Sequence, residues 1–121
     1  MFTIDVITVT VEIANETVRR LESLGHAVTG VSRTDEAEGS IPCAAVSSLL
    51  RAAAASLAES PAVDAVGSAS SPGSLAINVT AVYDERWLRG VSDVILAGLR
   101  GIESDFPEEL EVKIMHTDRR V

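Results

Sequence analysis

Residues 43–59 read CAAVSSLLRAAAASLAE and carry the clearest helix pattern in the chain. Alanine has the highest intrinsic helix propensity of all residues. Apolar side chains recur at helical spacing and form one stripe along this segment: Cys43, Val46, Leu49, Leu50, Ala53 and Leu57. Ser60-Pro61 ends the helix, since proline is not tolerated in a helix interior. The apolar stripe has to be buried against other elements, which the flanking sequence must supply.

The sequence before this helix predicts two extended segments. Residues 2–12 are rich in Thr, Val and Ile, which is typical of a strand, and their alternation slips near Val6-Ile7, which indicates a bulge or burial on both faces. Residues 14–16 suit a turn, because asparagine tolerates left-handed backbone. Residues 17–25, TVRRLESLG, are ambiguous. Local propensity favours a helix there, whereas a segment bounded by a turn and a glycine also suits the return strand of a hairpin.

The sequence after the helix predicts three more strands and a second helix. Residues 62–66 suit a short strand, and the turn-forming stretch 67–74 leads to an alternating strand at 75–83. A second amphipathic helix covers roughly 85–104, and residues 109–116 make the last strand.

Three glycines interrupt the second helix, at positions 90, 98 and 101. Each costs about 1 kcal/mol relative to alanine in a helix interior. Close packing against the sheet is the first explanation for them, and a subunit contact is the second.

These elements predict an α+β fold in one domain spanning residues 1–121. Two amphipathic helices and four to five strands in the order β-β-α-β-β-α-β, mostly joined by hairpin-length links, form a two-layer sandwich with a mostly antiparallel sheet.

Composition narrows the class of protein. The 121 residues are 46% hydrophobic and 23% charged, as in ordinary globular proteins. No segment approaches the roughly 18 consecutive apolar residues of a membrane helix, and the N-terminus lacks the layout of a signal peptide, so we expect a cytoplasmic protein without a membrane partner. One cysteine and two histidines make a metal site improbable, and we expect no cofactor.

The net charge of −8 argues against nucleic acid as a partner and favours a cationic one. Aromatic residues make up only 3% of the chain, so surfaces on which bases could stack are scarce as well.

Residues 27–42, AVTGVSRTDEAEGSIP, follow neither the period of a helix nor that of a strand. They predict a loop that is long for so small a domain, and such loops are usually functional. With glycines at 30 and 39 and few large apolar side chains, we expect a mobile loop that opens and closes over an active site.

Two residues beside this loop could carry chemistry. Cys43 falls in the first turn of the best helix, with Ser40 or Ile41 as N-cap, where the helix dipole favours a thiolate and lowers the thiol pKa. His26 precedes the loop and could act as its base. The alternative is structural: cysteine is among the most buried residue types, and Cys43 also falls on the apolar stripe. His116, in the last strand, is expected to be structural or exposed.

Two motifs surround these residues, Gly25-His26-Ala27 and, after the loop, Cys43-Ala44-Ala45-Val46-Ser47 at a helix start. In this order they resemble the motifs of the ribosomal-processing cysteine protease family, Prp. The resemblance extends over the whole chain in length and element order. It implies that residues 17–25 form a strand and that Cys43 is the nucleophile and His26 the base of a Cys/His dyad.

The resemblance also implies supporting residues and partners. Ser47 matches a family serine near the nucleophile, and Gly25 matches a glycine at which the loop hinges. The implied substrate is the precursor of a large-subunit ribosomal protein, from which a short N-terminal extension is removed, and the implied assembly is a homodimer.

The chain departs from the family pattern in two ways. Ser40 stands three positions before the cysteine, where the family usually has an acidic residue, and the loop is longer than is common. The alternative function is a non-enzymatic protein that binds a basic ribosomal partner, with Cys43 as a buried core residue.

Overall fold

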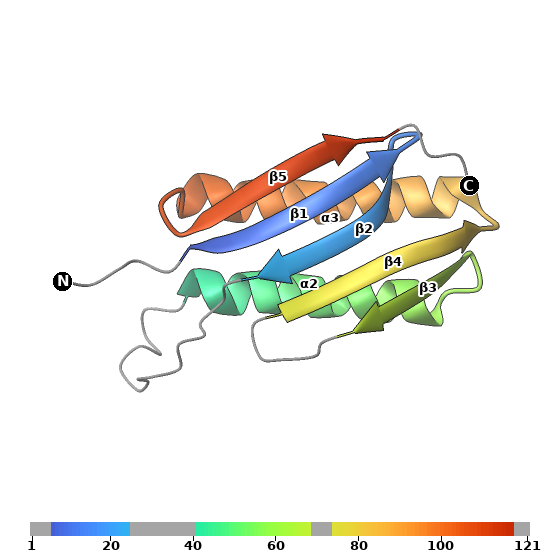
Figure 1. The fold of residues 1–121 in the computed structure, drawn as a ribbon, viewed down its shortest axis with the longest axis horizontal. Helices are drawn as coiled ribbons and strands as arrows, with labels where there is room; N and C mark the ends of the chain where they lie inside the picture. The colour runs from blue at the N-terminus through green and yellow to red at the C-terminus, as the bar shows by residue number, and fades with distance from the viewer. Residues whose placement is uncertain (1–5, 25–40, 69–73, 118–121) are drawn as a thin grey trace.

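The computed structural model describes residues 6–24, 41–68 and 74–117. Seven elements follow one another in these residues: β1 (Ile7–Ala14), β2 (Thr17–Leu24), α2 (Ile41–Glu59), β3 (Val63–Ser68), β4 (Ser74–Val82), α3 (Glu85–Asp105) and β5 (Leu110–His116). The strands form one five-stranded sheet in the order β3-β4-β2-β1-β5. Both helices cover the same face of this sheet (Figure 1). The predicted α+β fold, with its element order, is therefore confirmed.

The sheet is mostly antiparallel, as predicted, but its two terminal strands pair in parallel. The β1–β2, β2–β4 and β3–β4 pairings are antiparallel, whereas β1 pairs with β5 in parallel. β1 consequently lies inside the sheet, between β2 and β5.

The ambiguous segment 17–25 is a strand, β2, which ends at Leu24 within the described residues. A two-residue turn at Asn15 (φ 55°) and Glu16 (φ 63°) joins it to β1. Positive φ at both central residues is typical of the turn whose twist matches that of a hairpin. The predicted turn is confirmed, and asparagine is one of the residues that tolerates this backbone.

The first hairpin contains a bulge, at a different place from the one that the sequence indicated. β1 begins at Ile7, and the register shifts between Glu12, opposite Arg20, and Ile13, opposite Val18. Arg19 is therefore the extra residue on β2.

Three contacts stabilise this bulge. The Val18 N–H donates to the buried hydroxyl of Ser92 on α3 at 2.8 Å. Arg19 is 3% exposed; its Nε donates to Thr17 Oγ1 at 3.0 Å, and its Nη2 lies 3.2 Å from Glu85 Oε2 at the start of α3. Side chains thus join the hairpin to α3 where the backbone ladder is interrupted.

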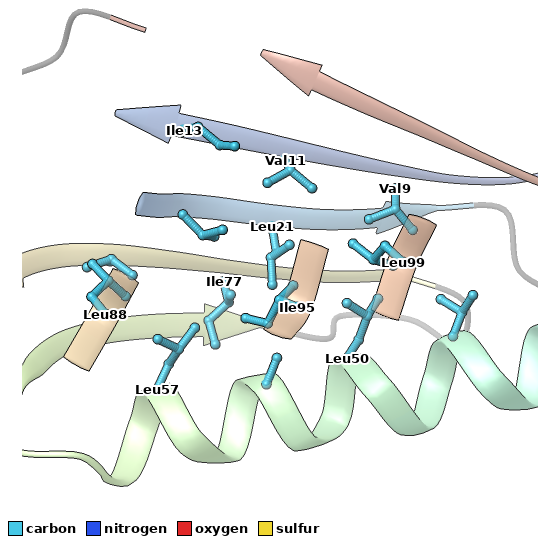
Figure 2. Close-up of a cluster of buried hydrophobic side chains, with 14 of the residues drawn as sticks. Val9, Val11, Ile13, Leu21, Leu50, Leu57, Ile77, Leu88, Ile95 and Leu99 are labelled. Carbon is cyan, nitrogen blue, oxygen red and sulfur yellow. The ribbon is translucent and has the colours of Figure 1, made fainter. Parts of the chain in front are cut away.

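The core fills the space between the sheet and the two helices. Figure 2 shows Leu50 and Leu57 of α2 beside Ile95 and Leu99 of α3, under the strand side chains that point toward them. Leu57 and Leu99 are fully buried. Burial of large aliphatic side chains of this kind contributes roughly 1.5–3 kcal/mol each.

α2 begins at Ile41, two residues before the alanine-rich pattern that starts at Cys43, so Ile41 and Pro42 belong to the helix and not to the loop. Of the two predicted N-cap residues, Ile41 is helical, and Ser40 lies outside the described residues. Pro42 is buried in the first turn, where its missing N–H would have no intrahelical partner in any case. The rest of the predicted loop, with its expected mobility, lies outside the described residues.

By length and composition alone, α2 would also pass as a membrane helix, with a mean hydropathy of 1.5 over its apolar window. Core helices of soluble proteins, which are mostly buried, meet the same criterion, and 28% of this window is buried. Here Val46, Leu50 and Leu57 are buried against the rest of the fold.

The three glycines of α3 differ in their surroundings. A Cβ on Gly98 would lie 2.9 Å from Leu49 Cδ2, so this glycine permits close approach to α2 rather than to the sheet. A Cβ on Gly90 or Gly101 would have no atom within 4 Å. Close packing against the sheet is therefore the wrong explanation for these glycines, and the second explanation, a subunit contact, stays a prediction for Gly90 and Gly101.

Candidate active site

Cys43 is the third residue of α2, in the first turn as predicted. Its side chain is partly buried and packs against the core cluster. The first N–H groups of a helix have no intrahelical partner and carry the positive end of the helix dipole. Cys43 is thus neither sealed in the core nor fully exposed, and it lies beside backbone N–H groups that can stabilise an oxyanion.

Burial raises the pKa of the Cys43 thiol above its ordinary value, because desolvation disfavours the charged thiolate. The sequence argument predicts the opposite direction, since it counts only the dipole at the helix start. Desolvation by burial is the cause of this upward shift. The thiol form is therefore favoured, and a nearby base is required if the thiolate is to form near neutral pH.

Ser47 lies one helical turn after Cys43 and is partly buried like it. Residues four apart on a helix are neighbours on the same side. Of the predicted site residues, these two are the ones that the structure brings together.

The other three predicted site residues, Gly25, His26 and Ser40, lie outside the described residues. What the structure describes is the chain on either side of them. β2 ends at Leu24 and α2 begins at Ile41. The end of β2 and the start of α2 lie at the same end of the molecule (Figure 1).

The second histidine lies elsewhere. His116 is the last residue of β5 and is exposed. Its partner in the parallel register is Ile13, next to the turn between β1 and β2, and this turn is at the opposite end of the molecule from the start of α2 (Figure 1). His116 is therefore no candidate for the base of Cys43.

An acidic corner, which the sequence argument missed, lies at the same end as Cys43. It consists of the last residues of α3 and the first of β5: Glu103, Asp105, Glu108, Glu109 and Glu111. The end of α3 and the start of β5 share the end of the molecule at which α2 begins (Figure 1). The sequence feature that could have predicted this corner is the run ESDFPEELEV (residues 103–112), which contains five acidic residues and no basic one.

Among the described residues, no group of three or more His, Cys, Asp or Glu side chains could hold a metal ion. The chemistry that this end of the molecule supports is that of a thiol at a helix start.

Comparison with known proteins points to the same chemistry. The family model described as cysteine protease Prp matches residues 6–111. No curated protein gives a significant match.

Solved structures share the fold. SMU.848 from Streptococcus mutans superposes with a TM-score of 0.71 at 23% identity, over 93% of this chain and 99% of that one. The S. aureus protein described as an essential ribosomal processing protease Prp, in complex with a substrate peptide, gives a TM-score of 0.70 at 19% identity, over 89% of this chain and 98% of that one. The same protease with a covalently linked product peptide gives 0.69 at 18%, with the same coverage.

Proposed function

The chain belongs to the Prp family of cysteine proteases, and on that premise we propose that it removes the N-terminal extension of a large-subunit ribosomal protein by thiolate attack on the peptide bond. The observation that carries the proposal is the place of Cys43, in the first turn of α2 and inside the segment that the family model matches. The ribosomal substrate is supported by the S. aureus neighbours, which are described as ribosomal processing proteases.

In the proposed mechanism, His26 takes the Cys43 proton. Burial favours the thiol form, so the nucleophile needs this base. His26 follows Leu24 by two residues, a stretch of chain that spans at most roughly 7 Å, and Leu24 ends its strand at the Cys43 end of the molecule (Figure 1). The end of β2 and the start of α2 thus lie at the same end of the molecule, which supports the dyad.

The later steps use the helix start and the same histidine. The thiolate attacks the scissile carbonyl, and backbone N–H groups of the first turn of α2, such as those of Cys43 and Ala44, stabilise the oxyanion. His26 then protonates the leaving amine, and water hydrolyses the thioester. Ser47, one turn after the nucleophile, supports the site from the same side of the helix. In this proposal Gly25 is the hinge of the loop. Ser40 stands where the family usually has an acidic residue.

The setting of the reaction is also a proposal. We place the enzyme in the cytoplasm, in keeping with a ribosomal substrate. We place it there as a homodimer, which is the assembly that the family resemblance implies. Sedimentation equilibrium at micromolar concentration tests the assembly, and a monomer would contradict it.

The decisive experiment is incubation with the precursor ribosomal protein of the same organism, followed by mass spectrometry of the products. We expect loss of the N-terminal extension with the wild type and no cleavage by the His26→Ala variant. Ser48→Ala, an exposed change on another side of α2, is the matched control and should cleave normally. An intact precursor after incubation with the wild type would overturn the proposal.

One observation favours a second candidate, the non-enzymatic binding protein. Cys43 packs against the core, and burial raises its pKa, as for a structural cysteine. Under this alternative the wild type binds the precursor without cutting it.

A further inference from the structure

β3 is one of the two outer strands of the sheet, and β5 is the other. An outer strand presents backbone N–H and C=O groups along its open side, and an extended peptide can pair with them. Among the described residues, no strand pairs with the outer side of β3. The two edges therefore offer places where a polypeptide could add to the sheet.

The two edges differ in protection. β5 carries Glu111 and Lys113 on its exposed side, and charged side chains of this kind discourage pairing. The last four residues of β3 are Ala65, Val66, Gly67 and Ser68, without charge or proline. Val66 is 59% exposed.

The one charged residue of β3 is held at the start of the strand. The Tyr83 hydroxyl donates to Asp64 Oδ2 at 2.7 Å, and the Thr80 hydroxyl donates to the Asp64 carbonyl at 3.2 Å. Thr80 belongs to β4, and Tyr83 follows β4 directly, so both partners lie on the inner side of β3. The carboxylate is thus engaged, and the described residues leave the outer side of the uncharged half of β3 open.

This open half points toward the candidate active site. β3 starts four residues after the end of α2 and runs back along the helix, so its last residue is the one nearest the Cys43 end (Figure 1). From Glu59 back to Cys43 the helix rises roughly 24 Å. β3 retraces roughly 16 Å of that path. Because the strand runs at an angle to the helix (Figure 1), these lengths leave a gap of at least roughly 8 Å, which takes at least about three residues of extended peptide to span.

We propose that the outer edge of β3 binds the substrate polypeptide as a sixth strand and leads it to Cys43. The proposal rests on the proposed protease function, since an endopeptidase takes an extended polypeptide as its substrate. Pairing of backbone groups would supply affinity that depends little on sequence, and the exposed Val66 would add an apolar contact on one face. The partner is thus an extended segment that begins at least about three residues from the scissile bond.

Hydrogen exchange tests the proposal directly. The probe is a peptide that spans the processing site of the precursor, added to the Cys43→Ala variant so that it binds without being cut. We expect the amides of residues 64–68 that point away from β4, which are every second one along the strand, to exchange at least tenfold more slowly with the peptide than without it. Amides of β5, the other edge, are the internal control and should not change.

A second measurement uses the wild type. A series of peptides carries one backbone N-methyl group each, at successive positions beyond the third residue from the scissile bond. N-methylation should lower kcat/KM at least tenfold where the peptide N–H pairs with β3. At the positions in between, kcat/KM should not change. The unmethylated peptide shows whether the enzyme cleaves at all.

The outcomes separate the two proposals. Cleavage of the unmethylated peptide with no slowing at β3 overturns the edge proposal and leaves the protease function in place. The β3 amides could instead be protected before any peptide is added, with protection that rises with protein concentration. That result would show a second copy of the chain on this edge and would also overturn the edge proposal. Absence of cleavage contradicts the protease function, and the edge proposal fails with it.

Discussion

At the scale of single residues, Cys43 shows what a sequence can predict about a site. Its place in the first turn followed from the helix pattern, Pro42 and the family motif, all of which are local. The direction of its pKa did not follow, because desolvation depends on the side chains that the fold packs around the thiol. The same limit applies to His26, whose pairing with Cys43 remains a prediction.

The first prediction concerns the substitution Cys43→Ala. Alanine is the best helix former, and the change removes a single partly buried sulfur atom, so the fold should remain. We expect no cleavage of the precursor and a free energy of unfolding within about 1 kcal/mol of the wild type. The measurements are the cleavage assay and urea unfolding. Cleavage at the wild-type rate would contradict the nucleophile assignment, and loss of the fold would favour the buried structural cysteine.

The second prediction uses the pH dependence of Cys43 alkylation by iodoacetamide. In His26→Ala, burial acts on the thiol without the histidine, so alkylation should reach half its maximal rate at a higher pH than for N-acetylcysteine. In the wild type, an ion pair with His26 should lower that midpoint relative to the variant. Superimposable profiles for the two proteins would exclude His26 from the chemistry of the thiol.

At the scale of elements, long periodic segments were predictable and their partners were not. The pattern of residues 43–59 placed α2 to within two residues at its start. β2 was ambiguous because its identity depends on pairing with β1 and β4, which local propensity does not contain. The bulge at Arg19 was missed for a similar reason, since the Ser92 hydroxyl, which accepts a hydrogen bond from the neighbouring Val18 N–H, belongs to α3.

The third prediction compares two glycines of α3. Gly101→Ala places a methyl group where no atom lies within 4 Å, so only the gain in helix propensity, about 1 kcal/mol, should appear. We expect Tm to rise by roughly 3–6 °C. Gly98→Ala gains the same propensity but forces Leu49 to move from a 2.9 Å contact, so its Tm should be lower than that of Gly101→Ala. Calorimetry of both variants is the measurement, and equal shifts would contradict the contact between the helices.

The fourth prediction concerns the bulge. Ser92→Ala removes the acceptor of the buried Val18 N–H and should lower the free energy of unfolding by about 1–3 kcal/mol. Ser48→Ala, exposed on α2, is the matched control and should have an effect near zero. Urea unfolding of both variants checks this, and a Ser92→Ala variant as stable as the control would mean that the bulge needs no bond from α3.

At the scale of the whole molecule, the number and order of elements followed from the sequence, whereas the arrangement of the strands did not. Mostly antiparallel pairing was expected from the short connections, but the position of β1 between β2 and β5 joins segments from opposite ends of the chain. The net charge was likewise known from composition. The position of the acidic corner at the Cys43 end could not be predicted, because it depends on the topology that places the end of α3, the start of β5 and the start of α2 at one end of the molecule (Figure 1).

The fifth prediction follows from that charge. If the acidic corner attracts a basic substrate, kcat/KM for the precursor should fall about tenfold or more between low and high salt, through slower association and with kcat unchanged. Replacing Glu108 and Glu109 with glutamine should make the salt dependence shallower. Stopped-flow binding to the Cys43→Ala variant measures association directly. A flat response in all proteins would leave the net charge of −8 without a role in substrate encounter.

The parallel pairing of β1 with β5 also governs how the nascent chain can reach its final state. The hairpin of β1 and β2 can close early in translation, but one side of β1 stays open until β5 has been made. At roughly 5–20 residues per second, that delay is on the order of 5–20 s. During this time an apolar strand edge is available to chaperones and to aggregation. A chain that stops before β5 keeps this edge open, so incomplete translation products should be insoluble or degraded rather than partly active.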